Sequence, residues 1–227
     1  MSEAAPGYSD SPTFATPARA RLAGAVRDLI DAVMTSAEMS EDGLDAVAVE
    51  VGRATVRLTG SLDGERPGGA GYTPRSHGDY LPRSPVVGEA SPLSPRIDWD
   101  VVDGRVVGTG TFSAAYEGPP GFVHGGIVAL TFDEMLGIAN IASGHPGMTG
   151  TLTVRYRRPT PLHREVRFDA WVEEVEGRRV VSRGTVHDGE TLTAEAEGIF
   201  IRPRPELAAE YFGREPDAPP PSADGER

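Results

Sequence analysis

Residues 125–142, GGIVALTFDEMLGIANIA, are apolar on nearly every side when drawn as a helix, yet they carry adjacent acids at Asp133 and Glu134. A helix without a polar face must be covered almost all round. Two strand-like runs precede this helix and four follow it, with short links that suit antiparallel neighbours. We therefore predict an α+β fold in which one antiparallel sheet wraps around one long central helix.

Alternation of apolar and polar residues defines the strand-like runs, and turn residues separate them. Asp103-Gly104 predicts a hairpin between a run that begins near Ile97 and a strand over residues 105–116. A second Asp-Gly, at Asp188-Gly189, separates the last two strands. The runs after the helix cover residues 151–158, 165–175, 178–186 and 191–201.

The flanks differ from this core in composition. Thr16-Pro17 and Ser40 are start signals for two helices, over residues 17–39 and 40–58, and a Gly- and Pro-rich loop follows them. Polar, Pro-rich ends cannot bury enough apolar surface to become ordered. The predicted organisation is a disordered segment (1–15), a helical extension with its loop (16–94), the sheet-and-helix domain (95–203) and a mostly disordered tail (204–227).

Charge and composition limit the partners. The net charge of -12 argues against nucleic acid and anionic membranes. No Cys is present, so disulfides and thiolate metal sites are excluded. No signal peptide is apparent, and we expect that no apolar run approaches the roughly 18 residues of a membrane-spanning helix. A cytoplasmic protein without a membrane partner is expected.

The central helix starts with residues suited to acyl chemistry. The first amides of a helix have no intrahelical acceptor, and those of Gly125 and Gly126 are not screened by side chains, so they can stabilise an oxyanion. His124 precedes them and is expected to cap the helix, orient the loop or contact substrate. Asp133 can act as a base or as a nucleophile. Glu134 points about 100° away, which favours a supporting role in structure or substrate binding.

Two motifs together resemble one known family. GFVHGGIVALTFDEMLG and MTGTLTVRYRRPTPL resemble the hotdog-fold acyl-CoA thioesterases of the phenylacetate-pathway (PaaI-like) type, the group that includes the carboxyl-terminal-modulator thioesterase. The match lies in His-Gly-Gly at the helix start, an acid eight residues after the first Gly, and Tyr-Arg-Arg-Pro on the next strand. It covers about residues 95–203. The resemblance implies a hotdog fold, hydrolysis of an acyl-CoA thioester without a cofactor, and a homodimer or tetramer whose active site lies at the subunit interface.

The resemblance also implies roles for single residues. Similar thioesterases place a catalytic threonine sixteen residues after the acid, which is Thr149 here, with Thr151 as the alternative if the register differs. They often carry Asn or Gln six residues before the His, where this chain has Gly118, so one polar contact of the family is missing.

A basic cluster follows the third-strand motif. Arg155 and Arg157 share a strand face, and Arg158 follows them. Guanidinium groups suit phosphates, so these residues are candidates for the nucleotide end of coenzyme A. A solvated strand face explains the same pattern.

Helix geometry predicts that two chains share the site. Gly125 and Asp133 are eight residues apart, about 12 Å along one helix, so one thioester carbonyl cannot contact both in one subunit. Two antiparallel helices in a two-fold dimer bring Gly125 of one chain to Asp133 of the other.

Other functions stay open at this stage. A hotdog hydratase or dehydratase pairs His with an acid at one carbon, and a non-catalytic acyl-binding protein needs no base. An acyl-carrier-protein thioester is an alternative substrate to acyl-CoA. The histidines at positions 124, 145 and 163 lack the short spacing of metal ligands, so no metal site is expected.

Overall fold

A computed structural model describes residues 16–59 and 81–204. Their main body is a six-stranded sheet in the order β1-β2-β4-β5-β6-β3, and every pair of neighbours is antiparallel. The predicted strands are present, most of them with small shifts at their ends. The bounds are β1 (Asp98–Val102), β2 (Arg105–Thr111), β3 (Met148–Tyr156), β4 (Glu165–Glu176), β5 (Arg179–Asp188) and β6 (Thr191–Ile201).

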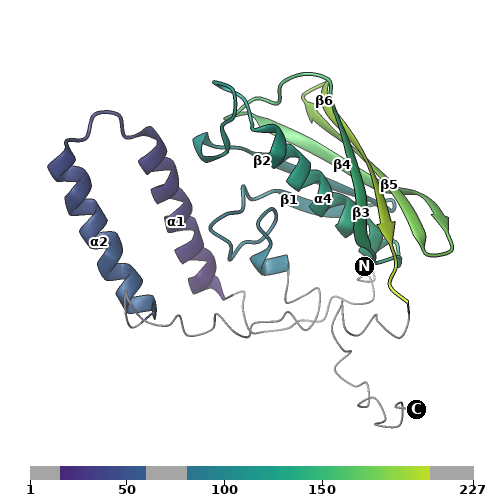
Figure 1. Cartoon of the computed structure of the whole chain (residues 1–227), viewed down its shortest axis with the longest axis horizontal. Helices are drawn as coiled ribbons and strands as arrows, with labels where there is room; N and C mark the ends of the chain where they lie inside the picture. Colours follow the sequence, from purple (N-terminus) through teal and green to yellow (C-terminus); the bar gives the residue numbers. More distant parts are fainter. Residues whose placement is uncertain (1–15, 60–80, 205–227) are drawn as a thin grey trace, which may run out of the picture.

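Helix α4 (Gly125–Ala142) lies against one face of this sheet, as Figure 1 shows. Its residues fall at the predicted positions 125–142. One side of the helix is buried against the strands, and the largest side chains there are Phe132, Met135 and Leu136. The predicted architecture, one antiparallel sheet around one central helix with a helical extension before it, is confirmed.

Buried glycines on the sheet let the helix approach closely. Gly198 on β6 faces α4, and a Cβ built there would lie 2.5 Å from the Phe200 ring and 3.0 Å from Leu136. A Cβ at Gly184 on β5 would lie 3.2 Å from the Phe132 ring. The helix therefore sits where strand side chains would otherwise be.

The first hairpin forms at the predicted turn, but the strand after it is shorter than expected. Asp103 and Gly104 have φ angles of 51° and 75°, the positive pair that a type I′ turn requires. The predicted end of the strand over residues 105–116 was wrong, because β2 stops at Thr111. Its last pair is Thr111 with Glu165, where β4 begins, so the chain beyond has no strand partner. Residues 114–116 form a 3-10 turn instead, η2 (Ala114–Tyr116).

Two helices form an arm before the sheet (Figure 1). These are α1 (Pro17–Thr35) and α2 (Glu41–Thr59), and α1 ends short of the predicted residue 39. Both predicted start signals act as caps: the Thr16 hydroxyl accepts from the Arg19 amide at 3.3 Å, and the Ser40 hydroxyl accepts from the Gly43 amide at 3.3 Å. Helix α1 buries Ala23, whereas no residue of 41–58 in α2 is buried.

The segment before β1 belongs to the packed body. Leu81, in the 3-10 turn η1 (Leu81–Arg83), joins Val86 and Ile97 in the hydrophobic core. The core thus extends upstream of residue 95, where composition placed the start of the domain. The predicted disordered segment, most of the Gly- and Pro-rich loop and nearly all of the tail lie outside the described residues.

Helix α4 also corrects the expectation about apolar runs. This helix is 18 residues long and has a mean hydropathy of 1.3. By length and composition it is the one helix among the described residues that could cross a membrane. The expectation that no run approaches this length was wrong. Packing against the sheet accounts for the composition, since 44% of the span is buried inside the chain.

Replacing Gly198 with Ala should destabilise the protein. The added methyl group would collide with Phe200 and Leu136, and overpacking of this kind costs about 1–3 kcal/mol of unfolding free energy. Urea denaturation measures the change. Gly24→Ala on α1 is the control, since its Cβ would meet only the far end of Arg27 at 3.7 Å. Equal stability of the two variants would show that α4 does not depend on this close approach.

Candidate active site

His124 caps helix α4. Its Nδ1 accepts a hydrogen bond from the Gly126 amide at 3.0 Å, which places the proton of the neutral imidazole on Nε2. Its own amide donates to the Tyr116 carbonyl at 2.9 Å, which ties the helix start to η2. The Gly126 amide is therefore occupied. Within residues 16–59 and 81–204, the Gly125 amide has no hydrogen-bond acceptor, so it is the donor available to an anion.

The loop before His124 explains the missing polar residue at position 118. The Gly118 amide donates to the Phe122 carbonyl at 2.9 Å, and the Glu117 carboxylate accepts from the Gly121 amide at 2.7 Å. A Cβ at Gly118 would lie 2.7 Å from the His124 Cα. A side chain such as Asn or Gln does not fit in this loop conformation.

Asp133 and Thr149 meet across the gap between α4 and β3. The Thr149 hydroxyl donates to Asp133 Oδ1 at 2.8 Å, and the Asp133 side chain is half-buried. This contact depends on a β-bulge in β3. Thr149 pairs with Phe200 of β6 and Thr151 pairs with the adjacent Ile199, so Gly150 between them has no partner on β6. The extra residue turns Thr149 to the helix side and leaves Thr151 on the other face. Thr149, rather than the alternative Thr151, contacts the acid.

Glu134 does not share this arrangement. It follows Asp133 on the helix and is half-buried, with its Oε1 shielded from solvent. Its place around the helix agrees with the prediction that the two carboxylates do not face one site.

Tyr156 is a residue of the site that the sequence analysis missed. It ends β3, and its hydroxyl donates to the Gly125 carbonyl at 2.7 Å. Its ring lies 3.4 Å from the position of a Cβ on Gly125, so it borders the exposed amide. The alternation of the strand could have predicted its position. Tyr156 falls on the same side of β3 as Leu152 and Val154, which pack against the core.

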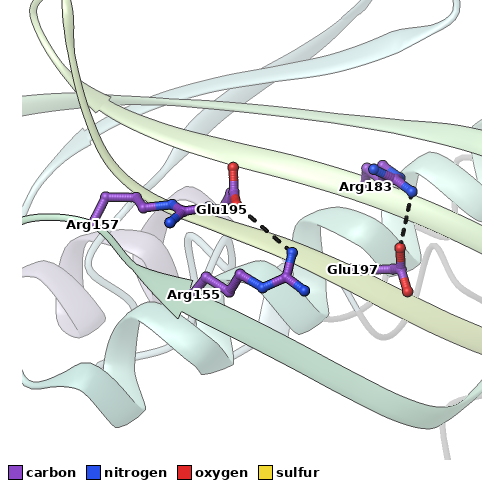
Figure 2. A network of polar contacts seen from close by, with 5 residues as sticks. All are labelled: Arg155, Arg157, Arg183, Glu195 and Glu197. Atoms are coloured by element: carbon purple, nitrogen blue, oxygen red, sulfur yellow. Dashed lines mark hydrogen bonds and ion pairs between the residues drawn. The ribbon is translucent and has the colours of Figure 1, made fainter.

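The basic cluster points away from this site. Arg155 and Arg157 share a strand face as predicted, but that face is opposite to α4 (Figure 2). Both pair with Glu195 on β6, Arg157 at 2.5 Å and Arg155 at 3.9 Å. The structure does not bring them to Gly125 or Asp133. Arg158 is exposed and makes no ion pair with any residue in the described ranges.

The exposed side of α4 carries a stripe of two glycines, one leucine and one acid. Gly126, Leu130, Asp133 and Gly137 follow one another at helical spacing, and Leu130 is 40% exposed. A Cβ on Gly137 would meet nothing within 4 Å. We call this row, residues 126, 130, 133 and 137, the α4 stripe. It is the part of the helix that the chain's own sheet leaves uncovered.

No group of three or more potential metal ligands occurs within the part of the chain that the structure describes. The polar groups near α4 are instead suited to hydrogen bonding and proton transfer.

Comparison with known proteins gives the family. The thioesterase superfamily description matches residues 120–195. The crystal structure of protein RHA08564, a thioesterase superfamily protein, is 31% identical, has a TM-score of 0.72, and the match covers 84% of this chain and 97% of that one. This chain belongs to the thioesterase superfamily. The thioesterase membership expected from the His-Gly-Gly and Tyr-Arg-Arg-Pro motifs is thereby confirmed.

Curated relatives match this thioesterase superfamily chain over a shorter stretch. Acyl-coenzyme A thioesterase THEM4 of Xenopus laevis is 41% identical over 88 residues, which are 38% of this chain and 40% of that protein. Acyl-coenzyme A thioesterase THEM5 of Homo sapiens is 30% identical over 88 residues, 38% of this chain and 36% of that protein. The chain thus spans about 40% of the length of the THEM4 relative.

Removing the His124 imidazole should weaken the start of α4. In a His124→Ala variant the Gly126 amide loses its acceptor, and loss of a helix cap costs about 0.5–2 kcal/mol of unfolding free energy. Chemical denaturation measures the loss. His124→Asn keeps a side-chain acceptor of cap type and should recover most of the stability. If both variants were as stable as the parent, the cap would contribute nothing.

Proposed function

We propose that this chain hydrolyses an acyl-CoA thioester to the free acid and coenzyme A. The observation that carries the proposal is the hydrogen bond from Thr149 to Asp133, which holds a half-exposed carboxylate on the open side of α4. The names of the relatives, acyl-coenzyme A thioesterases, support it. A thioester of a carrier protein presents the same carbonyl and is the alternative substrate.

Water is the nucleophile if Asp133 acts as a base. The carboxylate takes a proton while the water oxygen attacks the thioester carbonyl carbon, the carbon–sulfur bond then breaks, and the thiolate leaves. If Asp133 itself attacks, an acyl anhydride forms, the thiolate leaves, and water cleaves the anhydride. In both routes Thr149 orients the carboxylate.

The Gly125 amide is the proposed oxyanion donor. It lies at the positive end of α4 and has no acceptor among the described residues, whereas His124 occupies the neighbouring amide. Tyr156 positions this amide by holding the Gly125 carbonyl. Glu134 is assigned a supporting role near substrate.

We place the active site between two copies of the chain. About 12 Å of helix separates Gly125 from Asp133, so an antiparallel partner helix must supply one of them. The α4 stripe supports this arrangement, since it is open to a partner. Strand β3 supports it too, because it is the edge strand beside the site and carries Met148 at 51% exposure.

Arg158 is the preferred candidate for the coenzyme phosphates. Its guanidinium has no ion pair with the described residues, whereas Arg155 and Arg157 must first release Glu195 to bind a phosphate.

Release of thiol from a panel of acyl-CoAs, from short-chain to aromatic to long-chain, tests the activity. We expect turnover of at least one, and a loss of about 10²-fold or more in kcat for Asp133→Asn, because the amide cannot accept the proton or attack. Glu134→Gln is the matched control and should lose much less. A folded Asp133→Asn protein with parental kcat would disprove the role of Asp133, and no turnover of any thioester would disprove the activity.

Mixing two inactive variants tests the shared site. Asp133→Asn lacks the acid, and Gly125→Pro lacks the backbone N–H. Proline is tolerated at the first helical position. His124, at φ -60° and ψ 132°, already has the extended backbone that the residue before a proline prefers. Random exchange of subunits makes half the dimers mixed, with one complete site of two. About a quarter of the parental activity should return.

Two controls make the mixing experiment decisive. Mass spectrometry must show mixed dimers, and each variant alone must keep the circular dichroism of the parent. If mixed dimers form and no activity returns, the two groups do not come from different subunits.

A further inference from the structure

A cavity lies where α1 meets the segment before β1 and the chain after β2. It has a volume of about 260 Å³ and is bordered by α1, by residues 92–96 and by residues 111–116. The polar lining includes Arg27, Arg96, Asp28, Asp31 and Tyr116. We call it the seam cavity. Its volume is near the lower end of small-molecule sites, about 300–1,000 Å³, so it suits a small ligand and not a whole coenzyme.

Two guanidinium groups line the seam cavity without a carboxylate bound to either. No ion pair to Arg27 or Arg96 occurs among residues 16–59 and 81–204. Arg27 donates to the Ser91 carbonyl at 2.6 Å, which fixes its side chain and leaves other N–H groups for a ligand. Burial, and then the positive charge of Arg96, lower the pKa of Arg27, so the two groups are close enough to repel.

The acids of the seam cavity form no ion pair with either arginine among the described residues. The Asp31 carboxylate accepts from the Ala115 amide at 3.3 Å, which joins α1 to η2. The negative charge of Asp28 raises the pKa of Arg27, against the larger effects of burial and of Arg96 that lower it. Arg96 is held in the left-handed region at φ 60°, which is uncommon for an arginine, and its exposed side chain lies at the cavity.

We propose that the seam cavity is a binding site for the anionic group of a small molecule, a carboxylate or a phosphate, held between Arg27 and Arg96. Charge-assisted hydrogen bonds to guanidinium groups are the strong class, and an anion here also removes the repulsion between the two arginines. The carboxylate of a small organic acid and the phosphate of a nucleotide share this chemistry. The site is separate from Asp133 and does not require that the chain hydrolyse a thioester.

The wall of the seam cavity is joined to the helix cap. The Tyr116 hydroxyl donates to the Leu93 carbonyl at 3.1 Å, and the Tyr116 carbonyl accepts from the His124 amide at 2.9 Å. Burial raises the pKa of Tyr116 to about 12, so this hydroxyl keeps its proton at neutral pH. An anion in the seam cavity therefore clamps α1 to the segment that positions His124, and it should raise the melting temperature of the whole chain by mass action.

Titration calorimetry on the full-length Asp133→Asn protein tests the site without interference from turnover. The probes are butyrate, inorganic phosphate and adenosine 3′,5′-bisphosphate, each at fixed ionic strength in chloride, so that screening of surface charge stays constant. We expect saturable binding with one site per chain for at least one probe. Tighter binding by butyrate identifies an organic acid as the source, and tighter binding by the phosphates identifies a nucleotide.

Variants of the lining locate the site. Arg96→Asn, which suits a positive φ, and Arg27→Gln should each weaken binding by about 10-fold or more, since each removes a charge-assisted hydrogen bond. Arg53→Gln, an equal charge change on α2, should not alter it. Saturable binding that is unchanged in Arg96→Asn and Arg27→Gln overturns the proposal. The proposal is also overturned if no probe saturates the protein at concentrations up to about 10 times a millimolar Kd.

Discussion

The packing of α4 against the glycine-bearing face of the sheet is the contact on which the rest of this structure depends. Phe132 and Leu136 fill the space that strand side chains would occupy at Gly184 and Gly198, and Met135 does the same at Gly108. This contact fixes the rotation of the helix about its axis. Asp133 then falls on the open side by default, because its neighbours take the buried side. A carboxylate in an otherwise apolar helix is tolerated because it faces Thr149 and solvent and not the core.

Short-range sequence preferences predicted the helices and strands well because most element ends in this chain carry the residues typical of caps and turns. The hairpin at Asp103-Gly104, the caps at Thr16 and Ser40, and the strands after the helix follow from short-range preferences. The end of β2 did not follow, because it is set by where the partner strand begins, and that is information from a distant part of the sequence. Membrane-like composition in α4 was also underestimated, since an apolar run interrupted by two acids does not look continuous.

The candidate site was predicted in part for the same reason. The acid and the capping His could be proposed from the chemistry of the helix, whereas the threonine came from the family resemblance, and the structure joins Thr149 to Asp133. Alternation correctly put Arg155 and Arg157 on one face, but it could not say that Glu195 of another strand would meet them there. The contact of Gly118 with His124 and the seam cavity depend on how loops fold back, for which the sequence has no short-range signal.

The single unpaired residue in β3 separates that strand into two independent registers. Both parts pair with β6, but the odd-numbered Thr149 faces the helix before Gly150, whereas the even-numbered positions face it after Gly150. Mutational drift in the later part of the strand can therefore alter the outer, charged surface without moving Thr149. If the bulge closed so that Gly150 paired with Phe200, Thr149 would turn to the outer face and leave the carboxylate. Selection should therefore act on the position of this bulge more strongly than on most of the amino acids around it, and the bulge offers a designer a way to move a hydroxyl into or out of the site without changing the rest of the sheet.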